Sequence, residues 1–239
     1  MTEHRTRLID RKVVAADTMT FSFEKPMGFV FRAGQFATFV LPNGAKNDRG
    51  HSHHFTLAGA PHETNLMIVT RMRDSAYKRR LGNLPIGGEA TLRGPSGSFT
   101  LPDDEEAHAV FIAGGIGITP YLSMLRHARH VNRPGRITLF NSNRRPEDAA
   151  FLDELRQLDQ KAKNVEIVNT MTAEDDSVQE RSGETGHIDA AMLKRHLGDL
   201  SGPIYYAAGP PDMVSAMEDM LQKTEIKNDR IKAEQFSGY

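Results

Sequence analysis

Apolar and polar residues alternate in short runs along the first hundred residues, a pattern typical of β-strands. Thr, Val and Phe are frequent in these runs, and Gly and Pro separate them at intervals of about ten residues. The runs occupy residues 7–25, 31–42, 54–60, 65–72 and 88–102. This part of the chain is therefore predicted to be an antiparallel barrel or sandwich, with one short helix at 75–84 that ends before Pro85.

The pattern changes after an acidic connector at 102–108. Short apolar runs that predict buried strands now alternate with longer amphipathic segments that predict helices. The strands are expected at 109–113, 136–143, 165–171 and 203–209, and the helices at 119–131, 146–162, 189–197 and 211–224. In the first of these helices Thr119 is expected to be the cap and Pro120 the first helical residue. Alternating strands and helices imply a parallel sheet.

Composition adds mainly exclusions. Lys and Arg number 30 against 31 Asp and Glu, so no charge excess points to nucleic acid. No apolar run approaches the roughly 20 residues that span a bilayer, so membrane insertion is not expected. The chain has no cysteine, which excludes disulfides and cysteine-ligated iron–sulfur clusters within it. The polar N-terminus lacks the apolar core of a signal peptide, so a cytoplasmic location is the default expectation.

Two glycine turns carry the strongest chemical signal. In FIAGGIGITP (111–120) a buried strand runs into three glycines and then a helix, so backbone N–H groups can face an anion such as phosphate. Pro120 replaces the last glycine of the usual dinucleotide fingerprint, and a ligand-free tight turn is the alternative. A second turn, AAGPP (207–211), follows a later strand. Both turns lie at the carboxyl ends of predicted parallel strands, which favours a nucleotide site.

A histidine cluster raises a different question. RGHSHHF (49–55) holds His51, His53 and His54, which suggests a metal site. Successive residues of a strand face opposite sides, so His53 and His54 are not expected to converge on one ion. No carboxylate lies between Asp48 and Glu63, and no cysteine can complete a ligand set. No metal is therefore predicted here.

Six motifs in order resemble the ferredoxin–NADP reductase superfamily. They are AGQF (33–36), HHFTLAG (53–59), GPSGSF (94–99), AGGIGITP (113–120), YYAAGPPDMV (205–214) and EQFSGY (234–239). The resemblance implies an N-terminal antiparallel six-stranded β-barrel that binds flavin, at 1–103. It also implies a C-terminal α/β parallel-sheet NAD(P) domain with an aromatic tail, at 104–239. FAD is the implied flavin, and the implied reaction is hydride transfer from a nicotinamide to it.

The resemblance also assigns residues. Three are expected to act on the reacting groups: Thr56, Ala208 and Tyr239. A second set is expected to bind flavin: His53, His54, Phe55, Thr56, Val69, Thr70, Arg71, Ala76, Tyr77 and Lys78. A third set is expected to bind the nicotinamide nucleotide: Gly114, Gly115, Gly117, Thr119, Ser142, Arg144, Arg145, Gly209 and Pro210.

Three positions depart from the family pattern, and one of them is Phe55, which stands where the family has a tyrosine. His53 stands where the family has an arginine against the flavin phosphate, and Lys78, with Arg71, is expected to supply the missing charge. A protonated His53 would do part of this work, so flavin affinity is expected to weaken as pH rises past about 6.5. Ala208 stands where the family has a cysteine near the nicotinamide, which is expected to slow hydride transfer or loosen its placement.

The nucleotide and the electron acceptor are less directly indicated. Ser142, Arg144 and Arg145 follow the second parallel strand and suit a 2′-phosphate, which favours NADPH, with NADH as the alternative. The expected acceptor is a small acidic protein, ferredoxin or flavodoxin, steered by the basic stretch 71–80. The alternatives are reduction of small molecules (free flavin, quinone or ferric chelates) and a non-enzymatic protein that binds metal through its histidines or senses flavin.

Overall fold

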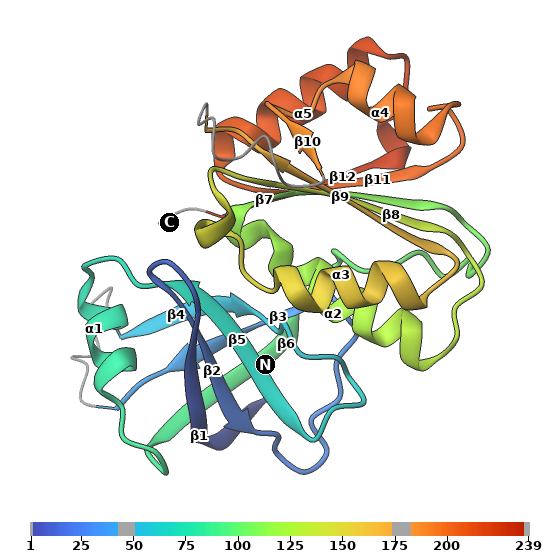
Figure 1. The fold of residues 1–239 in the computed structure, drawn as a ribbon. Helices are drawn as coiled ribbons and strands as arrows, with labels where there is room; N and C mark the ends of the chain where they lie inside the picture. The colour runs from blue at the N-terminus through green and yellow to red at the C-terminus, as the bar shows by residue number, and fades with distance from the viewer. Residues whose placement is uncertain (1, 43–50, 174–182, 237–239) are drawn as a thin grey trace. The chain divides into compact units, whose positions relative to one another are not determined.

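The structure is a computed structural model that describes residues 2–42, 51–173 and 183–236. It divides into two compact units (Figure 1): Met1–Thr100 with Thr119–Val131, and Leu101–Ile118 with Asn132–Tyr239. Within the described residues each unit contains one six-stranded sheet.

The first unit is an antiparallel β-structure. Its strands are β1 (Glu3–Ala15), β2 (Thr18–Glu24), β3 (Phe36–Val40), β4 (Ser52–Thr56), β5 (Asn65–Arg71) and β6 (Glu89–Ser96). They lie in the order β4-β3-β6-β1-β2-β5, and all five neighbouring pairs are antiparallel. The outer strands β4 and β5 also contact one another, which closes the sheet on itself. The predicted six-stranded antiparallel barrel is confirmed.

The barrel interior is filled from alternate strand positions. Phe21, Phe23 and Phe39 are fully buried there, and the Phe23 and Phe39 rings lie 4.9 Å apart. Helix α1 (Ala76–Asn83) adds Tyr77 and Leu81 to this core, and the Tyr77 hydroxyl donates to the Phe39 carbonyl at 3.0 Å. The predicted helix at 75–84 is therefore confirmed, because a polar N-cap and two buried side chains hold it.

Helix α2 (Ile118–His130) groups with the first unit. The Ser123 hydroxyl donates to the Gly59 carbonyl at 2.7 Å, and Arg126 pairs with Glu63 at 3.5 Å. The helix starts at Ile118, so Pro120 is its third residue and not its first. Pro is tolerated in the first turn, where the missing N–H has no helical acceptor.

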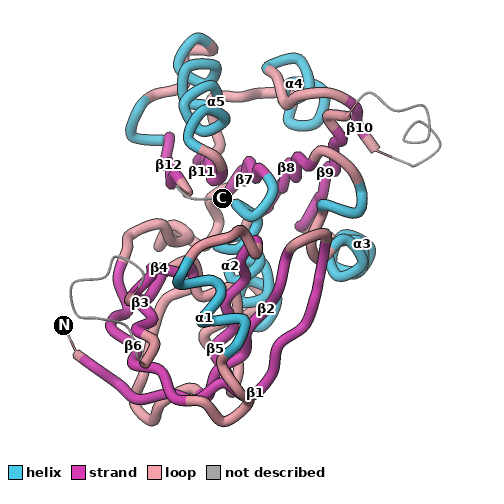
Figure 2. The backbone as a smooth tube through the Cα atoms, turned by 90° about the vertical axis from the view of Figure 1, so that its left-hand side faces the viewer, coloured by secondary structure: helices cyan, strands magenta, loops and turns pink. Residues whose placement is uncertain are grey.

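The second unit is a parallel sheet in the order β10-β9-β8-β7-β11-β12. Its strands are β7 (Ala109–Gly114), β8 (Ile137–Asn143), β9 (Val165–Met171), β10 (Glu184–Thr185), β11 (Ile204–Gly209) and β12 (Ile231–Gln235). All neighbouring pairs are parallel. Helix α3 (Leu152–Lys161) lies on one face of the sheet, and α4 (Ala190–Leu197) and α5 (Pro211–Lys223) lie on the other (Figures 1 and 2). The predicted parallel α/β sheet is confirmed.

One edge of this sheet is short. Strand β10 pairs with β9 through two residues, Glu184 opposite Thr170 and Thr185 opposite Met171. Farther back along β9, the Ile167 N–H is bonded to the carboxylate of Asp159 on α3, at 2.8 Å. A side chain thus takes the place of a neighbouring strand at this position.

Three local predictions were wrong in detail. Strands β10 and β12 were not predicted, because β10 has only two residues and β12 follows α5 in a segment interpreted as a tail. The helix predicted from Pro146 begins six residues later. Residues 146–148 form a 3₁₀ turn, and Phe151 adopts a left-handed conformation (φ 64°) that interrupts the helix before Leu152.

Candidate functional site

Strand β4 carries the predicted flavin residues on two opposite sides. His53 pairs with Phe39 and Phe55 with Ala37, whereas His54 pairs with Thr38. Phe55 is 2% exposed and belongs to the barrel core, 6.1 Å from the Phe39 ring. His54 is exposed, and its Nδ1 lies 2.8 Å from the Thr38 hydroxyl. The two histidines therefore face opposite ways, as strand geometry predicts.

Thr56 at the end of β4 has an unsatisfied hydroxyl. The residue is 6% exposed, and its Oγ1 atom finds no hydrogen-bond partner among the described residues. A buried hydroxyl left without a partner costs about 1–3 kcal/mol. The structure therefore offers a ready hydrogen-bonding group at the position where the resemblance expects flavin.

His53 sits in an aromatic group. Its ring centroid lies 5.0 Å from that of Phe55 and 5.4 Å from that of Tyr77. Burial lowers the pKa of His53, and the charges of Lys78 and His54 lower it further. Near pH 7 the ring is therefore neutral, and the predicted contribution of a protonated His53 to phosphate binding is confined to pH values below the ordinary 6.5. Burial within the same group raises the pKa of Tyr77.

Positive charge gathers instead around the start of α1. Lys78 is 3% exposed, and burial, Arg73 and Arg71 together lower its pKa to about 8. The Ser75 hydroxyl accepts from the Lys78 N–H at 3.2 Å and caps the helix. An anion near these cations would relieve their mutual repulsion. Of the remaining residues predicted here, Val69 and Thr70 are buried on β5, and Ala76 is the exposed first residue of α1.

In the second unit the two glycine turns pack against each other. Strands β7 and β11 are neighbours, with Ala113 opposite Ala208. A Cβ on Gly117 would overlap the Ala208 carbonyl oxygen, and a Cβ on Gly209 would lie 3.1 Å from the Gly114 carbonyl oxygen. Glycine is therefore required at both turns for their close approach.

Gly115 plays a different part in the same turn. Its φ is +53°, and a Cβ built there would meet nothing within 4 Å. The residue thus exposes backbone in open space at the carboxyl end of β7, where α/β sheets bind nucleotides. This cradle fits a dinucleotide phosphate. Thr119, two residues after the turn, is 4% exposed.

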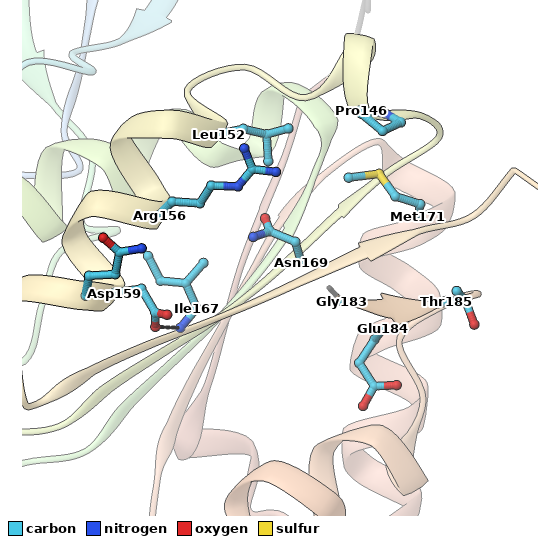
Figure 3. A pocket seen from close by; sticks show the side chains of 11 residues that line it. Pro146, Leu152, Arg156, Asp159, Ile167, Asn169, Met171, Gly183, Glu184 and Thr185 are labelled. Atoms are coloured by element: carbon cyan, nitrogen blue, oxygen red, sulfur yellow. Dashed lines mark hydrogen bonds between the residues drawn. The ribbon is translucent and has the colours of Figure 1, made fainter. Parts of the chain in front are cut away.

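The end of β8 forms a polar group beside a pocket. The Asn141 amide donates to Asn169 at 2.9 Å, and the Asn143 amide donates to Asn141 at 3.2 Å. Arg144 and Arg145 follow at the surface, and Ser142 is half-buried. A cavity of about 250 Å³ begins at Pro146, directly after them, and runs between α3 and the β9–β10 edge (Figure 3). Its lining includes Leu152, Arg156, Asn169 and Met171.

Sequence reasoning missed Glu234. The residue lies on β12 opposite Ala208, and burial raises the pKa of its carboxyl to about 7. Its Oε2 atom is buried and has no donor within the described ranges. The alternation in IKAEQF was the signal that could have indicated a strand here. The neighbouring Phe236 N–H donates to the Gly209 carbonyl at 2.9 Å, and the predicted Tyr239 lies outside the described residues.

The described segments contain neither a candidate metal centre nor a helix that could span a membrane. No three His, Asp or Glu side chains there are grouped so that they could hold a metal ion. None of the helices in those segments is long and apolar enough to cross a membrane.

Comparison with known proteins supports both units. Residues 111–219 match the oxidoreductase NAD-binding domain family. The chain is 29% identical to ferredoxin–NADP reductase B of Sorangium cellulosum, over 90% of each protein. It is 26% identical to the reductase component of propane 2-monooxygenase from Rhodococcus jostii, over 98% of this chain and 64% of that protein. The chain spans 61–64% of the length of three such propane 2-monooxygenase components.

The fold as a whole has solved counterparts. The FAD/NAD-binding domain of nitric oxide dioxygenase from Vibrio cholerae has a TM-score of 0.83 at 19% identity, over 97% of this chain and 98% of that one. The ferredoxin reductase of carbazole 1,9a-dioxygenase has a TM-score of 0.82 at 21% identity, over 98% of this chain and 69% of that one. Residues 111–219 therefore match an oxidoreductase NAD-binding domain, and the chain as a whole is similar in sequence to a ferredoxin–NADP reductase and has the fold of a solved FAD/NAD-binding domain.

Proposed function

We propose that this protein is a flavin-dependent reductase that takes electrons from NADPH and passes them to an external one-electron carrier. The observation that carries the proposal is the buried Thr56 hydroxyl, which has no partner among the described residues and lies where the resemblance expects flavin, in a barrel that precedes an NAD-binding domain. When bound, FAD supplies the redox chemistry by accepting a hydride and releasing its two electrons singly. The residues of the chain bind, orient and screen the reactants.

On the barrel, Thr56 would offer its hydroxyl to the flavin ring. Lys78 and Arg71 would neutralise the flavin phosphates, since the neutral His53 ring supplies no charge near pH 7. His54 and Phe55 are carried on the same strand, but Phe55 is core and His54 is exposed. We therefore assign phosphate binding chiefly to Lys78, and flavin contact by Phe55 stays a prediction.

On the second unit, the backbone at Gly115 would hold the nucleotide phosphates. Gly117 and Gly209 would shape the turn together with Pro210. Ala208 would leave room where the family pattern has a cysteine. The exposed Arg144 and Arg145 would meet a 2′-phosphate. Because the pocket between α3 and the β9–β10 edge opens directly after them, we propose that it receives the adenosine end of NADPH.

The electron acceptor is proposed to be a ferredoxin or flavodoxin. Several relatives are named as reductase components of oxygenases, such as the carnitine monooxygenase reductase subunit of Escherichia coli at 28% identity. The basic side chains of segment 71–80 would attract an acidic carrier and raise its rate of encounter. A cytoplasmic location stays a prediction from the sequence.

An absorbance experiment tests the central claim. Purified protein reconstituted with FAD should be yellow, and anaerobic NADPH should bleach it more effectively than NADH. Bound flavin that NADPH fails to bleach would refute the reductase function and favour a flavin-sensing role.

The acceptor is then tested by steady-state NADPH oxidation. Ferredoxin, flavodoxin, free flavin, a quinone and a ferric chelate are supplied in turn. A protein carrier should give the highest kcat/KM, and its rate should fall steeply between low salt and the roughly 0.15 M at which the Debye length shrinks to about 8 Å. A salt-independent rate, or a faster small-molecule acceptor, would reject the proposed carrier.

A further inference from the structure

The pocket between α3 and the β9–β10 edge has three charged side chains in its described lining, and two of them are already engaged. The Asp159 carboxylate accepts from the Ile167 N–H at 2.8 Å. The Glu184 carboxylate is paired with Arg195 at 2.9 Å. The third charged side chain, Arg156, is therefore the one that a ligand can recruit.

Arg156 has only a surface contact to give up. Its guanidinium lies 3.1 Å from the Asp153 carboxylate one turn earlier on α3, and the two side chains are 56% and 90% exposed. Exposed ion pairs of this kind contribute little to stability. A guanidinium offers five N–H donors in a planar fork that matches phosphate oxygens, so an anion in the pocket would be the stronger partner.

A chain of three asparagine amides supplies a second donor. The Asn143 NH2 group donates to Asn141 Oδ1 at 3.2 Å, and the Asn141 NH2 group donates to Asn169 Oδ1 at 2.9 Å. Asn141 and Asn143 are buried, where an unpaired amide is costly, so the two bonds fix the direction of the chain. Because the Asn169 oxygen is occupied, its NH2 group faces the pocket, and that group has no acceptor among the described residues.

Arg156 and Asn169 approach the pocket from opposite walls. Figure 3 shows the guanidinium coming from α3 and the amide from β9, while the Glu184 side chain points away from both. Within the described part of the chain no hydrogen bond joins Arg156 to Asn169. The donors of both residues can therefore meet on one ligand group.

The rest of the lining indicates what that group is. Pro146, Leu152 and Met171 supply apolar surface, and the volume of about 250 Å³ lies below the roughly 300–1,000 Å³ of sites that hold a whole small molecule. The pocket therefore suits one end of a dinucleotide. Sites that prefer NAD use a carboxylate to hold the ribose hydroxyls, whereas both carboxylates in this lining are engaged and the available groups are donors. A phosphate fits these donors.

We infer that Arg156 and Asn169 form a clamp that selects the 2′-phosphorylated dinucleotide. The guanidinium pairs with the oxygens of the 2′-phosphate, and the Asn169 NH2 group donates to one of them. The inference rests on the proposed function, because it takes the nucleotide to be NADPH. It deepens that function by assigning discrimination against NADH to two residues of the pocket lining, in addition to the exposed Arg144 and Arg145.

Three substitutions isolate the clamp. Arg156→Gln removes the charge, and Arg156→Lys keeps the charge but not the fork. Asn169→Asp keeps an oxygen that accepts from Asn141 and replaces the donor by an anionic oxygen. The control is Lys161→Gln, at the exposed end of the same helix and outside the described lining.

Binding of 2′-phospho-AMP and of AMP to the FAD-loaded protein is measured by calorimetry at pH 7.5. The readout is the ratio of the AMP Kd to the 2′-phospho-AMP Kd, which isolates the contribution of the 2′-phosphate. The wild-type ratio should be about tenfold or more, and Arg156→Gln and Asn169→Asp should each lower it about tenfold, the effect of losing one hydrogen bond to a charged group. Arg156→Lys should be intermediate, and Lys161→Gln should match the wild type.

AMP serves as the internal control, because it lacks the group that the clamp holds. Its Kd should change less than about twofold in all variants, since the lost hydrogen bonds are made only by the 2′-phosphate. An Arg156→Gln protein that keeps the wild-type ratio overturns the inference. So does an Arg156→Gln protein that loses affinity for AMP and 2′-phospho-AMP equally, because Arg156 would then act on the shape of the pocket.

Flavin bleaching separates this inference from the proposed function. If the ratios follow the expected pattern but neither NADPH nor NADH bleaches the bound FAD, the clamp stands and the reductase function fails. If NADH and NADPH bleach the flavin equally well and the wild-type ratio is near one, the protein is a reductase without the clamp.

Discussion

Glu234 offers a direct test of how the second unit is assembled. Its carboxyl is buried on β12 beside β11, its Oε2 has no donor among the residues described, and burial raises its pKa from 4.5 to about 7. A group whose pKa is higher in the folded than in the unfolded protein keeps its proton on folding. Its favourable contribution to the free energy of unfolding is complete below pH 4.5 and is lost as pH rises through 7.

The size of the effect follows from the two pKa values. The full difference corresponds to about 3.4 kcal/mol at about 1.4 kcal/mol per pKa unit. Between pH 5 and pH 8 the part that is lost amounts to about 2.5 kcal/mol. The side chain of the variant Glu234→Gln does not titrate. Between pH 5 and pH 8 the free energy of unfolding of the wild type should therefore fall by about 2.5 kcal/mol more than that of the variant. It should also be the more stable protein at pH 8.

Urea unfolding, followed by far-UV circular dichroism at half-unit steps from pH 5 to pH 8, measures this difference. Glu218→Gln on α5, in the same unit, is the control and should track the wild type throughout. Parallel pH profiles for the wild type and Glu234→Gln would refute the reasoning, since the carboxyl would then be as well solvated in the folded protein as in the unfolded one.

Three further substitutions test the proposed nucleotide site and the proposed flavin site. Gly117→Ala places a Cβ against the Ala208 carbonyl oxygen, so it should destabilise the protein by about 1–3 kcal/mol, seen as a lower Tm. Lys78→Ala should weaken FAD binding about tenfold or more in fluorescence titrations. The control is Arg79→Ala, which should leave FAD affinity unchanged because the Arg79 side chain is exposed and paired with Asp74. Equal effects of the two substitutions would show that Lys78 does not bind the flavin phosphates. Thr56→Val should keep the wild-type Tm to within a few degrees, because its hydroxyl has no described partner, yet slow flavin reduction by NADPH about tenfold in stopped flow; an unchanged rate would show that the hydroxyl does not act.

Much of the fold was predictable because local patterns and packing agree. Alternating residues in β1 to β6 have one face in the barrel core, and the glycines after β7 and β11 are required by contacts between neighbouring strands. The alternation and the glycines can both be recognised from the local sequence. The number of barrel strands and the resemblance to reductases came from the ordered motifs rather than from periodicity.

Other features depend on contacts between distant segments. Phe151 has no sequence signal for a left-handed conformation, so the start of α3 was placed too early. The neutral state of His53 follows from burial beside Tyr77 and Lys78, which are distant in sequence. Glu234 was missed because its burial arises only when β12 joins the sheet.

The bond from Asp159 to the Ile167 N–H also has a consequence for solubility. An open strand edge presents free N–H and C=O groups that can template pairing with another chain and start aggregation. Beyond the two residues paired with β10, the outward N–H of Ile167 is already taken by a carboxylate that brings negative charge to the edge. A strand from a second molecule that docked there would have to displace this hydrogen bond and approach that charge. The parallel sheet thus carries its own barrier against edge-to-edge self-association.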